Sequence, residues 1–118
     1  MAGYKITKKE DSYTYTAPGH LDCKTQRLHD PQDVDGGRLV NGITYFLPFG
    51  GGTEMGKNPA ESIYYIKKGT MKFTAEDGTE AILTEGDSVH IASNYGKMVT
   101  NVGAESAEMV VILLPPAK

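Results

Sequence analysis

Two lysines are the residues of this sequence whose type and position suggest chemistry. Lys97 lies in the stretch 86–101, GDSVHIASNYGKMVTN, and Lys57 ends the glycine-rich stretch 51–57, GGTEMGK. If both side chains face one apolar cavity, their ammonium groups favour an anionic ligand such as a carboxylate. Burial and like-charge repulsion also lower a lysine pKa, which lets the amine act as a base or a Schiff-base nucleophile. The alternative is that both side chains extend into water, as most lysines do.

The stretch 51–57 also fits the start of a phosphate-binding loop. That motif continues with Ser or Thr and then a helix whose N-terminus faces the phosphates. Here Asn58 and Pro59 follow, and after them a β-type pattern. We therefore expect a glycine-rich loop rather than a nucleotide site.

The apolar pattern along the chain is that of short β-strands. No stretch of a dozen residues has apolar residues at helical spacing, whereas several segments alternate or are continuously apolar. Glu76-Asp77-Gly78 predicts a hairpin turn, and Pro115 ends the last strand because proline cannot donate to a ladder. The expected strands are 39–47, 71–75, 79–83, 88–91 and 107–114. About six to nine such strands predict a sandwich or barrel.

The first 38 residues have a weaker pattern. Residues 4–6 and 13–16 are candidate short strands, 18–31 is polar and irregular, and 33–37 is a turn. We interpret residues 1–38 as an N-terminal arm that packs on the barrel or on a partner subunit, and 39–118 as the barrel.

The spacing within 86–101 resembles the second sequence motif of the cupin family. The matching residues are Gly86, Ala92, Asn94, Lys97 and Asn101. In that family the residue four before the asparagine is normally a metal-binding histidine, and here it is Lys97. An ammonium group repels a divalent cation, so this residue argues against the usual metal chemistry.

The segment 61–73, ESIYYIKKGTMKF, resembles the first cupin motif, a hairpin with Gly69 at its turn. The glutamate ligand of the family would fall at Ser62, one residue after Glu61. Since side chains alternate along a strand, Glu61 and Ser62 should point to opposite sides of the sheet.

The His-x-His pair of the first motif would fall at Met55 and Lys57, or at Gly56 and Asn58. None of these is a usual zinc or iron ligand. The resemblance, over residues 39–114, implies an all-β cupin: a double-stranded β-helix, or jelly-roll barrel, with an extended N-terminal segment. It also implies a homodimer and a cavity that opens at the loops 48–60 and 92–97.

Further side chains on the expected strands and loops complete the predicted pocket. Tyrosines and Met55 would form apolar walls, Ser62 would offer a weak hydrogen bond, and Glu61 would pair with a lysine or act as a base. Core packing or exposure to solvent explains each of them equally well. The expected ligand-binding residues are Lys97, Lys57, Met55, Glu61, Ser62, Tyr45, Tyr64 and His90.

The histidines are the remaining good metal ligands. A displaced site could combine His90 with Glu54 or Glu61, whereas His20 and His29 lie in the N-terminal segment. Metal sites need three or four convergent ligands, which this spacing does not supply. We expect no metal and no cofactor, and the single cysteine, Cys23, to be a reduced thiol.

Composition excludes several classes of protein. The net charge of −3, with no basic cluster, argues against a nucleic-acid partner. The longest apolar run, MVVILL at 109–114, is too short to cross a membrane. The N-terminus has no apolar stretch typical of a secretion signal, so we expect a cytoplasmic protein.

Three functions follow from these features. The first is metal-independent binding of a small anionic organic molecule in the barrel cavity. The second is a metal-independent isomerase, lyase or decarboxylase that acts on a small carbonyl or carboxylate compound through Lys97. The third is a metalloenzyme with displaced ligands.

Overall fold

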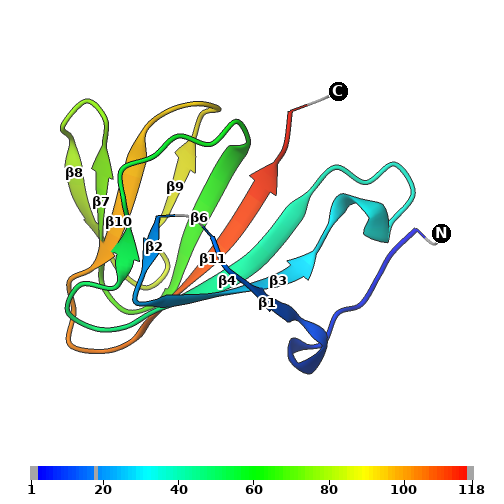
Figure 1. Cartoon of the computed structure of the whole chain (residues 1–118), viewed down its shortest axis with the longest axis horizontal. Coiled ribbons are helices and arrows are strands. Elements are labelled where there is room, and N and C mark those ends of the chain that lie inside the picture. The colour runs from blue at the N-terminus through cyan, green and yellow to red at the C-terminus, as the bar shows by residue number, and fades with distance from the viewer. Residues whose placement is uncertain (1–2, 18, 117–118) are drawn as a thin grey trace.

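The computed structural model describes residues 3–17 and 19–116, which form two antiparallel β-sheets and two short 3-10 helices (Figure 1). The elements are η1 (Lys9–Asp11), β1 (Tyr13–Tyr15), β2 (His20–Leu21), β3 (Cys23–His29), η2 (Pro31–Asp33), β4 (Val40–Phe46), β5 (Gly52–Thr53), β6 (Glu61–Lys68), β7 (Met71–Ala75), β8 (Glu80–Leu83), β9 (Ser88–Ile91), β10 (Lys97–Asn101) and β11 (Ala107–Leu114). The all-β prediction is confirmed.

The strand order defines the two layers of the fold. The first sheet has the order β1-β3-β4-β11-β6-β9, and the second has the order β2-β5-β10-β7-β8. Every strand pair is antiparallel. Strands that follow one another in sequence often lie in different sheets, which is the jelly-roll arrangement that we expected.

Alternation along the strands places one row of side chains between the sheets. In β4 every second residue, from Val40 to Phe46, is buried, whereas the residues between them are partly exposed. The apolar side chains of the main core cluster stabilise the fold, by about 1.5–3 kcal/mol for each large one. They are Phe46, Ile66, Met71, Val99, Ala107 and Met109.

The predicted hairpin across Gly69 is wrong. Strand β6 pairs with β11 and β9, whereas β7 pairs with β10 and β8, so the chain changes sheets between them. Gly69 allows this change because its φ is +96°, and a Cβ there would lie 2.8 Å from the Cβ of Ala107. Glycine is the residue that fits both conditions.

The N-terminal segment contributes strands to both sheets. β1 and β3 extend the first sheet beyond β4, and β2 pairs with β5 in the second. The prediction of a strand at 13–16 is confirmed, whereas residues 4–6 are not a strand. The polar stretch predicted as irregular contains β3, with residue 18 outside the described residues; it lacked an apolar alternation because only Thr25 of this strand is fully buried.

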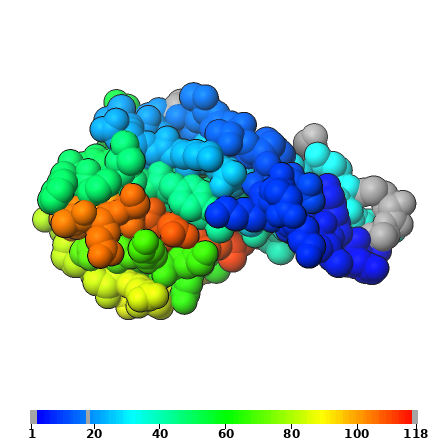
Figure 2. Space-filling view, turned by 90° about the horizontal axis from the view of Figure 1, so that it is seen from below, coloured from blue at the N-terminus to red at the C-terminus, as the bar shows by residue number. Residues whose placement is uncertain are grey.

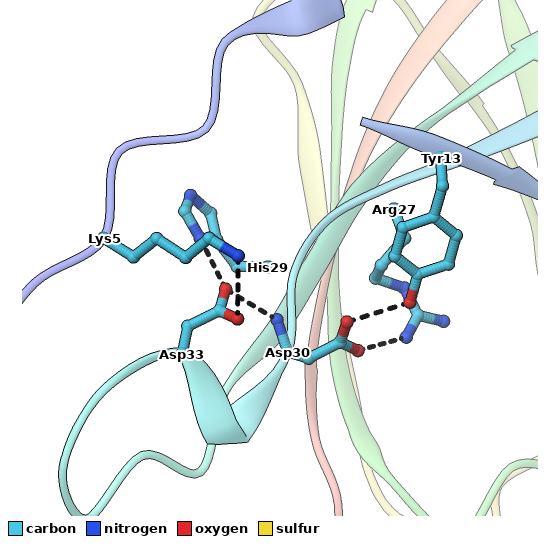
Figure 3. Close-up of polar contacts among 6 residues, drawn as sticks. All are labelled: Lys5, Tyr13, Arg27, His29, Asp30 and Asp33. Atoms are coloured by element: carbon cyan, nitrogen blue, oxygen red, sulfur yellow. Dashed lines mark hydrogen bonds and ion pairs between the residues drawn. The ribbon is translucent and has the colours of Figure 1, made fainter. Parts of the chain in front are cut away.

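Asp30 fixes one end of this segment by charge rather than by apolar packing (Figure 3). Its carboxylate accepts hydrogen bonds from the Tyr13 hydroxyl at 2.8 Å and from the Arg27 guanidinium at 2.9 Å. The bond to Asp30 raises the pKa of the Tyr13 hydroxyl. The guanidinium of Arg27 also lies 4.6 Å from the centre of the Tyr15 ring. Together these contacts tie β1 to the end of β3.

Asp33 forms a second set of contacts beside the first. Its carboxylate accepts from the backbone N–H of Asp30 at 3.1 Å and lies 3.0 Å from Nδ1 of His29 and 3.5 Å from Nζ of Lys5. The Asp30 N–H, followed by His29 and Lys5, lowers the pKa of Asp33. These contacts hold the N-terminal chain against the end of β3, where it extends beyond the sheets (Figure 2).

No helix within the described residues is long and apolar enough to cross a membrane. The homodimer and the cytoplasmic location stay predictions.

Candidate functional site

A cavity of about 150 Å³ lies between the two sheets, where β5 ends and β10 begins. Two backbone bridges join the loop after β5 to this region. The backbone groups of Gly56 and Lys97 exchange hydrogen bonds at 3.0 Å in both directions, and the N–H of Asn94 donates to the carbonyl of Asn58 at 2.8 Å. The loops expected at the cavity mouth therefore do meet. Side chains around the cavity include His20, Glu54, Lys57, Asn58, Tyr64 and Lys97.

Lys97 is the cation that reaches furthest into the protein at this cavity. Its side chain is half-buried, and desolvation lowers the pKa of its ammonium group. Among the described residues, no carboxylate lies within 4.0 Å of this ammonium group. A partly buried charge without a counter-ion is costly, so an anion placed here would gain a favourable contact.

Lys57 lines the same cavity but is more open to water. Its side chain is 63% exposed, and Nζ lies 3.9 Å from Oε1 of Glu76. The same Glu76 oxygen accepts a hydrogen bond from the backbone N–H of Gly96, which fixes the carboxylate at the mouth. The charge of Lys57 is therefore partly balanced within the protein.

Tyr64 forms the inner wall of the cavity from the first sheet. Burial raises the pKa of its hydroxyl to about 12, so the group stays protonated and can donate a hydrogen bond. Ser62, two residues earlier on the same face, is fully buried; its hydroxyl donates to the carbonyl of Ala60 at 3.4 Å. Ser62 is buried and is not among the residues that line the cavity.

Glu61 and His90 lie on the outer face of the first sheet. They pair with each other across β6 and β9, with Oε2 and Nε2 2.5 Å apart, and their side chains are 46% and 64% exposed. Glu61 and Ser62 thus point to opposite sides of the sheet, as alternation along a strand requires. Because the outer face is the wrong side for the cavity, the structure does not bring Glu61 or His90 to it.

Met55 and Tyr45 are also displaced from their expected positions. Met55 is 45% exposed and is not among the residues around this cavity, because the loop turns its side chain outward. Tyr45 belongs to the outward row of β4 and lines a different cavity. Of the expected ligand-binding residues, the structure therefore brings together Lys57, Tyr64 and Lys97.

Sequence reasoning missed three polar residues around the cavity as ligand-binding residues: His20, Glu54 and Asn58. His20 arrives through β2, a strand of two residues whose partner in the ladder is Thr53. The backbone N–H of Glu54 donates to the carbonyl of Gly19 at 2.8 Å and holds this contact. A two-residue strand leaves no periodic signal, whereas Glu54 and Asn58 were detectable as direct neighbours of the stretch 55–57.

The residues present do not fit a metal ion. Within residues 3–17 and 19–116 no group of three or more His, Cys, Asp and Glu side chains could hold one. The three histidines lie apart: His20 lies at the cavity, His29 beside Asp33, and His90 on the outer face. At the cavity two lysines accompany His20 and Glu54, and ammonium groups are not ligands.

Comparison with known proteins gives a family and a fold. The family model for the cupin domain matches residues 44–113. Beta-D-galactosidase Rv1717 of Mycobacterium tuberculosis is 29% identical over 112 residues, which cover 95% of each chain.

Solved structures are more distant in sequence. The polyketide cyclase RemF of Streptomyces resistomycificus matches 96% of this chain and 80% of its own, with a TM-score of 0.79 and 17% identity. A predicted oxalate decarboxylase of Thermotoga maritima matches 95% and 100%, with a TM-score of 0.78 and 14% identity. At such identities these structures show the fold alone.

Proposed function

Because this chain belongs to the cupin family, we propose that it binds a small anionic organic molecule in the cavity between its sheets, without a metal ion. The observation that carries this proposal is the ammonium group of Lys97. It is half-buried, its pKa is lowered by desolvation, and no described carboxylate pairs with it. A ligand carboxylate would supply the missing counter-charge.

The surrounding groups support a compact ligand with polar edges. The volume of about 150 Å³ is below the roughly 300–1,000 Å³ of typical drug-sized sites. Tyr64 offers a protonated hydroxyl. The side-chain oxygen of Asn58 accepts from the N–H of Ala60 at 2.8 Å, which leaves the amide NH₂ to donate. Both are suitable partners for ligand oxygens.

The charges at the mouth determine where the anion lies. Glu54 would repel an anion from its side of the cavity, and Lys57 is already close to Glu76. The ligand carboxylate is therefore placed at Lys97, and Lys57 acts at longer range. This arrangement selects small monoanions over highly charged ligands, because each added negative charge meets Glu54 or Glu76.

A second candidate is carbonyl chemistry at the same lysine. A lowered ammonium pKa increases the fraction of neutral amine, which is the form that attacks a carbonyl carbon. An isomerase, lyase or decarboxylase acting through a Schiff base would use this group. Borohydride reduction with a small keto acid should then attach the acid to Lys97, and repeated failure to trap an adduct would remove this candidate.

A third candidate rests on the galactosidase relative. Glycoside hydrolysis generally uses two carboxyl groups on either side of the bond that breaks. Glu54 is the one carboxylate among the described cavity-lining residues, with Glu76 at the mouth beyond Lys57. Turnover of a nitrophenyl β-D-galactoside that is lost in Glu54→Gln would support this activity; absence of turnover in the wild type would exclude that substrate.

The experiment for the main proposal is a thermal-shift screen of small monocarboxylates and dicarboxylates. Hits should stabilise the wild type and lose their effect in Lys97→Met. Lys72→Met is the matched control, because Lys72 lies on the neighbouring strand β7 with its side chain 34% exposed. If stabilisation survives in Lys97→Met, or is lost equally in the control, Lys97 is not the anchor and the proposal fails.

A further inference from the structure

A second and larger cavity, of about 410 Å³, lies at the other end of β10. Lys97 begins this strand at the first cavity, and Asn101 ends it. The amide of Asn101 donates to the carbonyl of Phe46, and Phe46 lines the second cavity. A strand of this length separates the two cavities by roughly 13 Å, so they are distinct sites.

The walls of the second cavity are mostly apolar. Cys23, Tyr45, Phe46 and Leu47 line it from the start of β3 and the end of β4. The polar lining residues, Asp22, Lys24 and Ser106, are exposed. A cavity with an apolar interior and polar groups at its edge is the usual form of a small-molecule site, and its volume lies within the usual range of roughly 300–1,000 Å³.

The loop after β4, beside this cavity, has two exposed apolar side chains. Leu47 is 56% exposed and Phe49 is 79% exposed, although both are large apolar side chains. The N–H of Phe49 donates to the carbonyl of Gly103 at 3.1 Å, which holds the loop after β4 against the loop before β11. In Figure 2 these two loops, green and orange, lie side by side. Leu47 lines the cavity, and Phe49 is a second exposed apolar side chain on the same loop.

The backbone at this corner is held in a costly conformation. Phe49 has a φ of +58° and Asp22 a φ of +50°, values that residues with side chains seldom adopt. The carbonyl of Asp22 accepts from the N–H of Leu47 at 2.9 Å, so the two strained segments are bonded to each other. Leu47, at one end of this hydrogen bond, lines the cavity, and Phe49, two residues later, is exposed.

We propose that this second cavity is a binding site for a small uncharged apolar molecule, about one or two aromatic rings in size. The ligand packs against Leu47 and Tyr45, and a hydroxyl or carbonyl of the ligand faces Ser106. An apolar cavity favours such a ligand because its walls offer few partners to water. The site is independent of the anion site at Lys97.

The first test uses the uncharged fluorescent probe N-phenyl-1-naphthylamine. The probe should bind the wild type saturably, with one site per chain, and Leu47→Asp should weaken binding by roughly tenfold or more. Ile82→Asp is the matched control, since Ile82 is also 56% exposed but lies on β8, outside this cavity. Lys97→Met should leave probe binding unchanged, which separates this site from the anion site.

The second test uses Cys23, which is the only cysteine in the sequence and lines the cavity. Saturating probe should slow the alkylation of Cys23 by iodoacetamide in the wild type, and Leu47→Asp should restore the rate. This readout needs no variant to show protection.

Three outcomes would overturn the proposal. The first is the absence of saturable probe binding, and the second is an equal loss of binding in Ile82→Asp. The third is protection of Cys23 that rises with protein concentration in the absence of probe, because a second copy of the chain would then cover the cavity.

Discussion

The side-chain amide of Asn101 donates a hydrogen bond of 3.2 Å to the backbone carbonyl oxygen of Phe46, so a polar group connects the two sheets inside the core. The same amide donates to the carbonyl of Glu105 at 2.8 Å, and its oxygen accepts from the N–H of Gly103 at 2.9 Å. Asn101 is fully buried, and each of its polar atoms has a partner.

Asn101→Ala should therefore be strongly destabilising. The change removes three hydrogen bonds, of which the one to Phe46 is buried and the other two are partly buried, and we expect a loss of about 3 kcal/mol in the free energy of unfolding. Urea denaturation measures this loss. Val102→Ala, at a neighbouring residue that is 44% exposed, should change the free energy by about 0.5 kcal/mol or less. Equal effects in the two variants would show that the buried hydrogen bonds do not stabilise the fold.

The difference in stability between the wild type and a variant without the Lys97 charge should depend on pH. Burial lowers the pKa of the Lys97 ammonium group from the ordinary 10.5. At neutral pH the charged form therefore destabilises the folded state relative to the unfolded chain. As the pH rises from the lowered pKa towards 10.5, the folded protein releases this proton before the unfolded chain does, and the cost of burial disappears.

Lys97→Met should thus be more stable than the wild type at pH 7. The gain is less than about 1 kcal/mol, because water reaches half of the side chain and screens the charge. The gain should disappear above about pH 11. Denaturation curves of both proteins at several pH values measure it, and a gain that does not change with pH would show that the charge is not its source.

Gly69 offers a test of the crossing between the sheets. Gly69→Ala places a Cβ 2.8 Å from the Cβ of Ala107 at a φ of +96°, whereas Gly78→Ala meets nothing within 4 Å at a φ of +90°. Both variants have the backbone penalty of about 1–2 kcal/mol, and only the first has the collision. We expect Gly69→Ala to be the less stable by at least about 1 kcal/mol. Equal losses would mean that β6 and β7 move apart freely.

Asp33 should control how tightly the N-terminal chain is held. Asp33→Asn removes the charge that attracts Lys5 and His29, so trypsin should cleave after Lys5 several times faster than in the wild type. Asp35→Asn, at an exposed position of the same segment, should leave the rate unchanged. Unchanged cleavage in Asp33→Asn would show that this ion pair does not hold the chain.

The pH dependence of that contact has a definite sign. Hydrogen bonds from Asp30 and His29 lower the pKa of Asp33, so its contribution to stability is complete above 3.8 and is lost as the pH falls through the lowered pKa. Asp33→Asn should remove this dependence on acid.

The strands that the sequence predicted best are those with a strong apolar pattern. β11 has the bounds expected from its continuous apolar run, and β9 has the expected bounds 88–91. β3 was missed because its inward row contains Cys23, Thr25 and Arg27, and a polar row is not recognised as the inner face of a strand. Arg27 is tolerated there because Asp30 and Tyr15 surround its charge.

The candidate site was predicted in part, because three of the expected residues, Lys57, Tyr64 and Lys97, line the cavity. Tyr64 lies within β6 and Lys97 is the first residue of β10, and each side chain lines the cavity from its strand. The prediction that Tyr45 lines this cavity is wrong, because Tyr45 lies on the outward row of β4. Which row faces inward depends on how β4 pairs with its neighbours. Contacts made by very short strands, such as that between His20 and Thr53, depend on the folded arrangement and have no local signal.

The chain passes from the second sheet to the first at Asp22. Residues 20–29 therefore pair with β5 in one sheet and with β4 in the other. A version without residues 1–38 would lack β2 and β3, so β5 and β4 would each have an unpaired backbone edge. Exposed sheet edges recruit other chains. Removing the N-terminal segment would therefore produce a protein that aggregates through its sheet edges rather than a smaller folded domain.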